Sequence, residues 1–168
     1  SEAPIVVAAR KIGLDENIAK DYPRVLEVPF SSSRKMMLTV SDVSGKDRLL
    51  PGGMELPPGT TLLSVCKGAP NFILDYCTEQ LGEDGTMRPM TDVDKQHVLD
   101  IVDKYSSRAL RVLAIAVRTF ERMPFDTADE DITTDQKFEA CRSNLQLLGL
   151  VASIDPDRDG VPESVEAA

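Results

Sequence analysis

Oxygen-bearing side chains near the end of the chain have the spacing of a calcium-binding loop. Residues 155–166 fit the pattern D-x-D-x-D-G-x5-E, in which the metal ligands would be Asp155, Asp157, Asp159 and Glu166. Such a loop should join two helices, whereas the apolar segment before it, residues 145–154, is predicted to form a strand. Pro162 also stands where an apolar residue normally closes the loop. A calcium-binding module is therefore kept only as an alternative interpretation.

Other motifs that commonly carry chemistry are absent from the sequence. It has neither the phosphate-binding pattern G-x-x-x-x-G-K-[ST] nor the dinucleotide-binding pattern G-x-G-x-x-G. His97 is the only histidine and lies in a predicted helix, so a Ser-His-Asp or Cys-His system is not expected. We predict no catalytic residue and no metal site within this chain.

The composition is typical of one acidic globular domain. Of 168 residues, 42% are apolar and 28% are charged, and 19 basic against 28 acidic side chains give a net charge of −9. That sign opposes binding to a nucleic-acid backbone. No apolar run approaches the ~20 residues of a membrane-spanning helix, and no signal peptide opens the chain. We expect a monomer that binds no nucleic acid and is not inserted in a membrane.

The cysteines indicate a reducing environment. Cys66, Cys77 and Cys141 form no C-x-x-C pair, and the first two lie among apolar residues. Buried, reduced thiols are the expected state, and a cytosolic setting follows.

The apolar periodicity predicts strands more often than helices. Strands are expected over residues 25–30, 35–40, 61–67, 110–118 and 145–154, with the third strand returning beside the second. Pro70 should begin a short helix that ends at Tyr76, and a capping box at Thr91 should begin a longer one. The predicted fold class is α+β, a mostly antiparallel twisted sheet flanked by helices.

The remaining segments are predicted to be loops or cut ends. Residues 41–60 are rich in glycine and proline, and residues 125–134 are acidic, so both are expected to be loops. Residues 5–12 have a helical pattern at the very start, and residues 161–168 look like the beginning of another helix. We interpret the chain as a piece of a longer protein.

Several short motifs, taken together and in order, resemble those of one family. They are V-P-F-S-S-S-R-K-M-M at 28–37, C-K-G-A-P at 66–70, L-R-V-L-A-I-A at 110–116, L-G-L at 148–150 and D-P-D-R at 155–158. This series resembles the nucleotide-binding domain of P-type ATPases, in the calcium- and sodium-pump branch. The resemblance covers nearly the whole chain. It implies a nucleotide-binding domain over residues 1–154 and, over 155–168, a hinge and the start of the return to the phosphorylation domain.

The resemblance also implies roles for individual residues. Phe30 would stack on adenine, Lys35 and Lys67 would line the pocket, and Arg111 would reach the phosphates. Small residues after Lys67 would let the backbone approach the ligand. The full set implied to bind nucleotide is Glu2, Phe30, Ser32, Lys35, Lys67, Gly68, Ala69, Arg111 and Leu113. Asp155 and Arg158 would approach the phosphates only in the closed, intact pump.

The sequence departs from the family pattern at a few positions. Asn71 replaces the glutamate that usually follows K-G-A-P, and Asp157 replaces the second proline of D-P-P-R. Ser32 stands where calcium pumps tend to carry a basic residue, whereas sodium pumps tolerate a serine there. The phosphorylated aspartate of D-K-T-G-T and the magnesium-holding segments T-G-D and D-G-x-N-D are not in this chain.

By this resemblance, the chain is the cytoplasmic ATP-binding part of an integral membrane cation pump. It would hold ATP or ADP and deliver the γ-phosphate, with Mg²⁺, to an aspartate on the phosphorylation domain of the same polypeptide. That domain and the actuator domain would be its partners, and the chain alone would hydrolyse nothing. A second alternative remains a ligand-free interaction domain, in which Lys35, Lys67 and Arg111 are surface charges.

Overall fold

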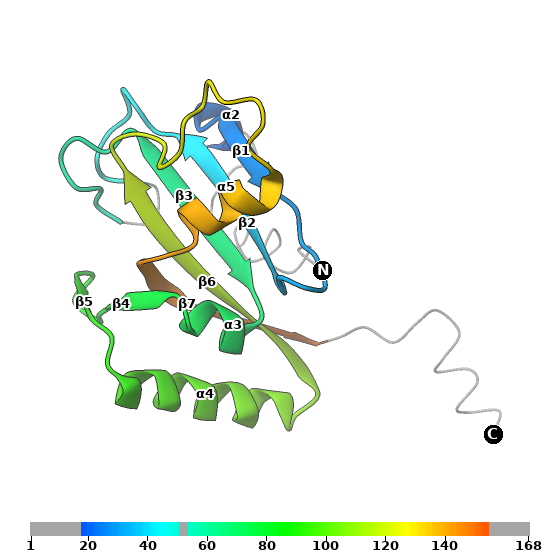
Figure 1. Cartoon of the computed structure of the whole chain (residues 1–168). Coiled ribbons are helices and arrows are strands. Elements are labelled where there is room, and N and C mark those ends of the chain that lie inside the picture. The colour runs from blue at the N-terminus through cyan, green and yellow to red at the C-terminus, as the bar shows by residue number, and fades with distance from the viewer. Residues whose placement is uncertain (1–17, 51–53, 155–168) are drawn as a thin grey trace.

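Seven strands form a single sheet in the computed structural model, which describes residues 18–50 and 54–154 (Figure 1). They are β1 (Arg24–Val28), β2 (Met36–Asp42), β3 (Leu62–Gly68), β4 (Cys77–Leu81), β5 (Met87–Pro89), β6 (Leu110–Phe120) and β7 (Leu145–Ile154). Their order across the sheet is β1-β2-β3-β6-β7-β4-β5. Among these strands only β4 and β7 pair in parallel. The predicted α+β class with a mostly antiparallel sheet is confirmed.

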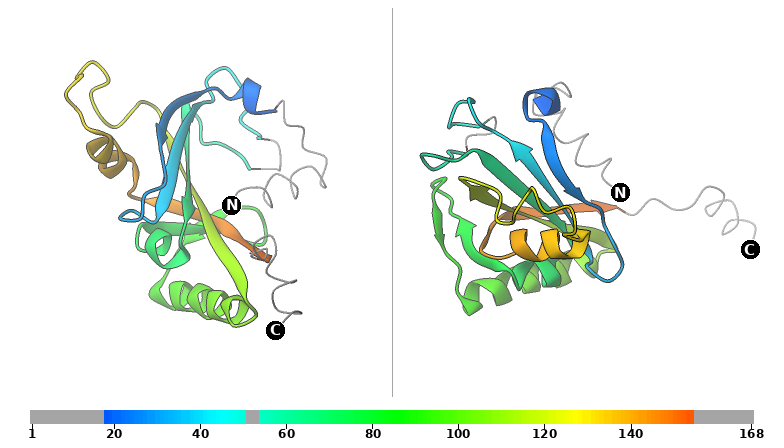
Figure 2. Two further views of the ribbon diagram at one scale, coloured as in Figure 1. Left: turned by 90° about the vertical axis from the view of Figure 1, so that its right-hand side faces the viewer. Right: turned by 45° about the horizontal axis from the view of Figure 1, so that its top comes forward.

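Helices accompany the sheet chiefly on one side. The described helices are α2 (Ile18–Asp21), α3 (Pro70–Leu74), α4 (Asp92–Ser106) and α5 (Thr134–Cys141). In the left-hand view of Figure 2, helices α3, α4 and α5 lie on the same side of the strands. None of the helices in the described ranges is long and apolar enough to cross a membrane.

Most of the strongly patterned elements are where the sequence predicted them. Strand β7 has the predicted bounds, and β3 returns beside β2 with Met37 opposite Lys67. The capping box is present: the Thr91 hydroxyl accepts a hydrogen bond from the Asp94 backbone N–H at 3.2 Å, and the Thr91 N–H donates to Asp94 at 2.9 Å. The prediction missed helix α5 and the β4–β5 hairpin. The helical pattern at residues 5–12 lies outside the described residues.

The hydrophobic core lies between the sheet and the helices. Alternate residues of the central strands are buried, among them Leu38, Cys66 and Ala116, and they belong to one cluster with Ile73 of α3 and Phe138 of α5. Because side chains alternate across a strand, the residues between these project to the opposite face of the sheet. That alternation places Lys67 of the predicted pocket, and Met37 opposite it on β2, on the face away from α3 and α5.

All three cysteines are buried, unpaired thiols of this core. The prediction of buried, reduced cysteines is confirmed. Burial raises the pKa of Cys66 and of Cys77 to about 12, and that of Cys141 to about 11, because a thiolate would lose its hydration there. These thiols are therefore neutral at physiological pH.

Candidate functional site

A pocket of about 560 Å³ opens at one end of the central strands, within the ~300–1,000 Å³ range of small-molecule sites. Its walls come from four separate segments of the chain: the β1–β2 connection, β2, the end of β3 and the start of β6. The lining residues are Phe30, Lys35, Met37, Lys67, Gly68, Ala69, Arg111, Val112 and Leu113. Seven of the residues predicted from the sequence are thus brought together in one place.

Strand register explains how residues so distant in sequence meet. Met37 on β2 pairs with Lys67 on β3, and Lys67 pairs in turn with Ile115 on β6. Arg111 and Leu113 lie four and two residues before Ile115, so all three side chains project from the same face of β6. The sheet thereby places the cationic side chains of Lys67 and Arg111 next to apolar side chains on the same face.

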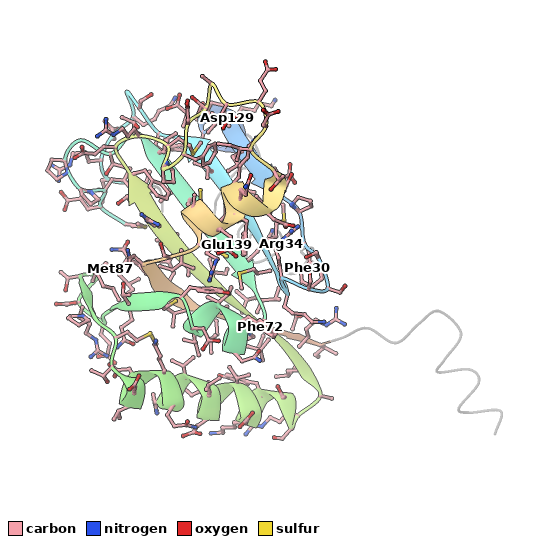
Figure 3. All side chains as sticks on the ribbon, viewed as in Figure 1. Phe30, Arg34, Phe72, Met87, Asp129 and Glu139 are labelled. Atoms are coloured by element: carbon pink, nitrogen blue, oxygen red, sulfur yellow. The ribbon has the colours of Figure 1, made fainter. Side chains whose placement is uncertain are left out.

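Phe30 and Lys35 bracket the turn that joins β1 to β2. Phe30 follows the end of β1 and its ring is 60% exposed, which is unusual for so large an apolar side chain. Figure 3 shows Phe30 on this turn, at the end of the sheet away from the acidic loop that carries Asp129. Lys35 has a φ of +59°, and its backbone N–H donates to the Ser31 carbonyl at 2.8 Å. The turn therefore presents an aromatic face and an ammonium group to one pocket.

Gly68 is needed where β3 meets this turn. A Cβ at Gly68 would lie 2.4 Å from the carbonyl oxygen of Lys35 and 2.6 Å from the Cα of Met36. The same close approach lets the Ala69 N–H donate to the Lys35 carbonyl at 3.0 Å. The sequence predicted that small residues here leave room for a ligand. The structure adds that the absence of a side chain at Gly68 lets the backbone at the end of β3 contact the backbone of the β1–β2 turn, so that two walls of the pocket meet there.

The electrostatic character of the pocket is opposite to that of the chain. Lys35, Lys67 and Arg111 line it, and no acidic side chain is among its lining residues in the described part of the chain. The whole chain nevertheless carries a net charge of −9. Cations gathered beside an exposed aromatic ring suit a ligand with a planar apolar group and negative charge.

Four predicted residues are not part of this arrangement. Ser32 is exposed in the turn after Phe30 and does not line the pocket. Glu2, Asp155 and Arg158 lie outside the described residues, as does the whole 155–166 calcium pattern. Within the described ranges, no group of three or more His, Cys, Asp or Glu side chains is placed to hold a metal ion.

Two lining residues were missed by the sequence analysis. Met37 is two positions beyond Lys35, so strand alternation could have placed it on the same face. Val112 lies between Arg111 and Leu113 and is 8% exposed. The alternation of side chains along β6 places Val112 on the core face, and nothing in the sequence pattern marks it as a pocket residue.

The chain is similar to transport ATPases over almost its whole length. It is 32% identical to the P-type sodium-transporting ATPase4 of Toxoplasma gondii over 99% of this chain. It is also 32% identical to the Probable cation-transporting ATPase F of Mycobacterium tuberculosis over 99% of this chain. Against Calcium-transporting ATPase 1 of Lactococcus lactis the identity is 29% over 100% of the chain.

These similarities concern one part of much longer proteins. The chain spans 14% of the length of the Toxoplasma relative and 16% of each of the other two. The family described as P-type ATPase, cytoplasmic domain N, matches residues 1–160. That match includes every segment that lines the pocket, and the α+β fold agrees with it. The chain belongs to the P-type ATPase cytoplasmic N-domain family.

Proposed function

We propose that the pocket binds ATP, with adenine stacked on Phe30 and the phosphates drawn by the cationic side chains. The observation that carries this proposal is the convergence of Phe30 with Lys35, Lys67 and Arg111 around one cavity of about 560 Å³. A ring that is 60% exposed offers a face for base stacking, which contributes roughly 1–3 kcal/mol per base. Met37 and Leu113 would supply the apolar floor.

The three cations would act on the phosphates in two different ways. Arg111 carries a planar guanidinium group, which can donate two parallel hydrogen bonds to phosphate oxygens. Lys35 and Lys67 carry compact charges that neutralise phosphate without fixing its orientation. The described lining residues include no carboxylate, the ligand type that Mg²⁺ prefers.

We further propose that the longer protein is a membrane cation pump that uses ATP. The relatives are named as sodium-, cation- and calcium-transporting ATPases, and this chain corresponds to 14–16% of their lengths. The phosphorylated aspartate would belong to a separate phosphorylation domain, because D-K-T-G-T is not in this sequence. The role of this chain would be to position ATP, with chemistry awaiting closure of the two domains.

The test is an isothermal titration of the chain with ATP, repeated for Phe30→Ala and Lys67→Gln. Loss of the stacking contact between Phe30 and the base corresponds to a rise in Kd of about fivefold to 150-fold. Loss of one charge-assisted contact to phosphate should raise Kd about tenfold. Leu49→Ala is the control for an exposed apolar side chain, since Leu49 is 62% exposed and is not among the lining residues. Lys104→Gln on α4 is the control for a lost lysine charge.

Wild-type binding that weakens only in the two pocket variants would support the proposal. An unchanged Kd in Phe30→Ala and Lys67→Gln, with the fold retained by circular dichroism, would contradict it. The same titration with calcium alone addresses the alternative at residues 155–166: heat with calcium and none with ATP would favour a calcium-binding module.

A further inference from the structure

Arg34 lies between two pocket residues in sequence but its side chain is directed to helix α5. Its Nη1 donates to Asp135 Oδ1 at 2.6 Å, and its guanidinium carbon lies 5.6 Å from the centre of the Phe138 ring. Asp135 and Phe138 are more than a hundred residues away along the chain. Figure 3 shows Arg34 beside α5, with Phe30 further along the same turn. Arg34 therefore links the turn to the helix packed on the other face of the sheet.

The same guanidinium group also holds the backbone of the turn. Its Nη2 donates to the carbonyl oxygen of Pro29 at 2.8 Å. The Arg34 N–H donates to the Ser31 hydroxyl at 3.1 Å, and the Lys35 N–H donates to the Ser31 carbonyl at 2.8 Å. Phe30 thus lies between two residues whose carbonyl groups are fixed by Arg34 and Lys35. The backbone that carries its exposed ring is held from both sides.

The environment of Arg34 differs from that of an ordinary surface arginine. Its side chain is 16% exposed, whereas Asp135 is 80% exposed. Its Nε atom is buried and has no hydrogen-bond partner among the described residues. Withdrawing a cation from water and leaving one donor unsatisfied are both unfavourable. The three contacts to Asp135, Pro29 and Phe138 must offset that cost, and together they define one position for the turn.

We propose that Arg34 is a positioning residue that, through Asp135, fixes the turn of residues 29–35 so that Phe30 faces the pocket. This rests on the proposed binding of ATP. Arg34 itself is not among the pocket-lining residues, so it acts through the residues beside it. A turn already held in the binding geometry loses less conformational entropy when the ligand binds.

Asp135 offers a cleaner test than Arg34, because its exposed side chain can be changed without opening the core. Asp135→Asn removes the charge and keeps the shape, and Asp135→Glu keeps the charge. The matched control is Glu139→Gln on the same helix, which removes the charge that pairs with Arg142 at 2.7 Å instead. ATP affinity of the 168-residue chain is measured for each variant, together with the midpoint of urea unfolding.

We expect Asp135→Asn to raise the Kd for ATP about fivefold. Asp135→Glu and Glu139→Gln should stay within about twofold of the wild-type chain. The decisive measurement is made in the Phe30→Ala variant, which lacks the aromatic ring. Adding Asp135→Asn to that variant should raise the Kd for ATP by less than about twofold, because the residue to be positioned is gone. A purely structural role for Asp135 would lower the urea midpoint and leave no such dependence on Phe30.

The outcomes separate this proposal from the one on which it rests. ATP binding by the wild-type chain with no change in Asp135→Asn overturns the positioning role alone. Equal weakening by Asp135→Asn and Glu139→Gln, or a full fivefold effect in the Phe30→Ala background, also overturns it. Failure of the wild-type chain to bind ATP at all overturns both proposals. Chemical shifts of the residue 30–35 amides, compared between wild type and Asp135→Asn without nucleotide, report the link directly.

Discussion

At the scale of single residues, the pocket depends on close backbone contacts as much as on side-chain types. Lys35 illustrates this. Its backbone has a φ of +59°, and its carbonyl oxygen accepts a hydrogen bond from the Ala69 N–H. Both features fix the backbone position from which its ammonium-bearing side chain extends. The approach is possible only because the residue opposite, Gly68, has no Cβ. The lysine could be identified from its motif, but its orientation follows from a contact with another strand.

Gly68→Ala should therefore destabilise the chain and disturb the pocket. The added methyl group would meet backbone atoms at 2.4–2.6 Å, and backbone atoms cannot rotate away as a flexible side chain can. We expect a loss of about 1–3 kcal/mol in the free energy of unfolding, measured with urea. Gly149→Ala is the matched control within another strand, because a Cβ there meets nothing within 4 Å. Equal stability of the two variants would show that Gly68 is not under this constraint.

At the scale of elements, helix starts were predictable where an apolar face followed the cap. The Thr91 box precedes a helix with half-buried Val98, Ile101, Val102 and Tyr105, and it was recognised. Thr133 forms an equivalent box with Gln136, but α5 has only eight residues and follows an acidic loop. The pattern T-x-x-Q is present at 133–136, but it overlaps the end of the acidic segment that was predicted to be a loop. Strand β5 has only three residues, and β4 carries apolar residues only at its two ends, so neither shows a period of two.

Thr91→Ala should loosen the start of α4. It removes the acceptor of the Asp94 N–H, and loss of a threonine cap costs about 1 kcal/mol of stability. Thr91→Ser keeps the hydroxyl and should restore most of the wild-type midpoint in urea. A midpoint unchanged in Thr91→Ala would mean that α4 is held by its packing on β6 and α3 alone.

The capping interaction between Thr91 and Asp94 also makes the stability of the chain depend on pH, in a direction that follows from the pKa of Asp94. Hydrogen bonds from the Thr91 backbone and side chain lower the pKa of Asp94 below its ordinary value of 3.8. A lowered pKa in the folded state means that the contribution to stability is present above pH 3.8 and is lost as pH falls through the folded value. The difference in urea midpoint between wild type and Thr91→Ala should therefore shrink in strong acid.

At the scale of the whole molecule, one continuous core connects elements from both ends of the described chain. Val28 of β1, Cys77 of β4 and Leu145 of β7 belong to the same buried cluster. Cys66, Cys77 and Cys141 are distributed through it, on β3, β4 and α5. Exposure of these thiols therefore reports opening of the core as a whole.

Thiol labelling at pH 8 should be slow in the folded chain and fast in urea. Burial holds the pKa of each thiol at about 11 or 12, against an ordinary value of 9.0. Because unfolded thiols lose their protons first as pH rises above 9, this contribution to stability is present below pH 9 and is lost as pH rises toward 12. We expect the urea midpoint to fall between pH 8 and 10. Rapid labelling of native protein would show local opening that the core does not predict.

The sequence by itself determined the long strands, the fold class, the buried cysteines and the family resemblance. These depend on local periodicity or on short motifs, such as K-G-A at 67–69, whose meaning does not require distant partners. Motif order also singled out Phe30, Lys35, Lys67 and Arg111 before their geometry was known. Their binding roles stay predictions until nucleotide affinity is measured.

Only the tertiary structure decided which of those residues share a pocket and what holds them there. Strand register placed Met37 beside Lys67, and a backbone contact across two strands made Gly68 necessary. The pairing of Arg34 with Asp135 joins positions separated by 101 residues, and no local pattern encodes it. Such contacts arise from the packing of α5 on the sheet, because burial of its apolar face fixes where its charged residues lie.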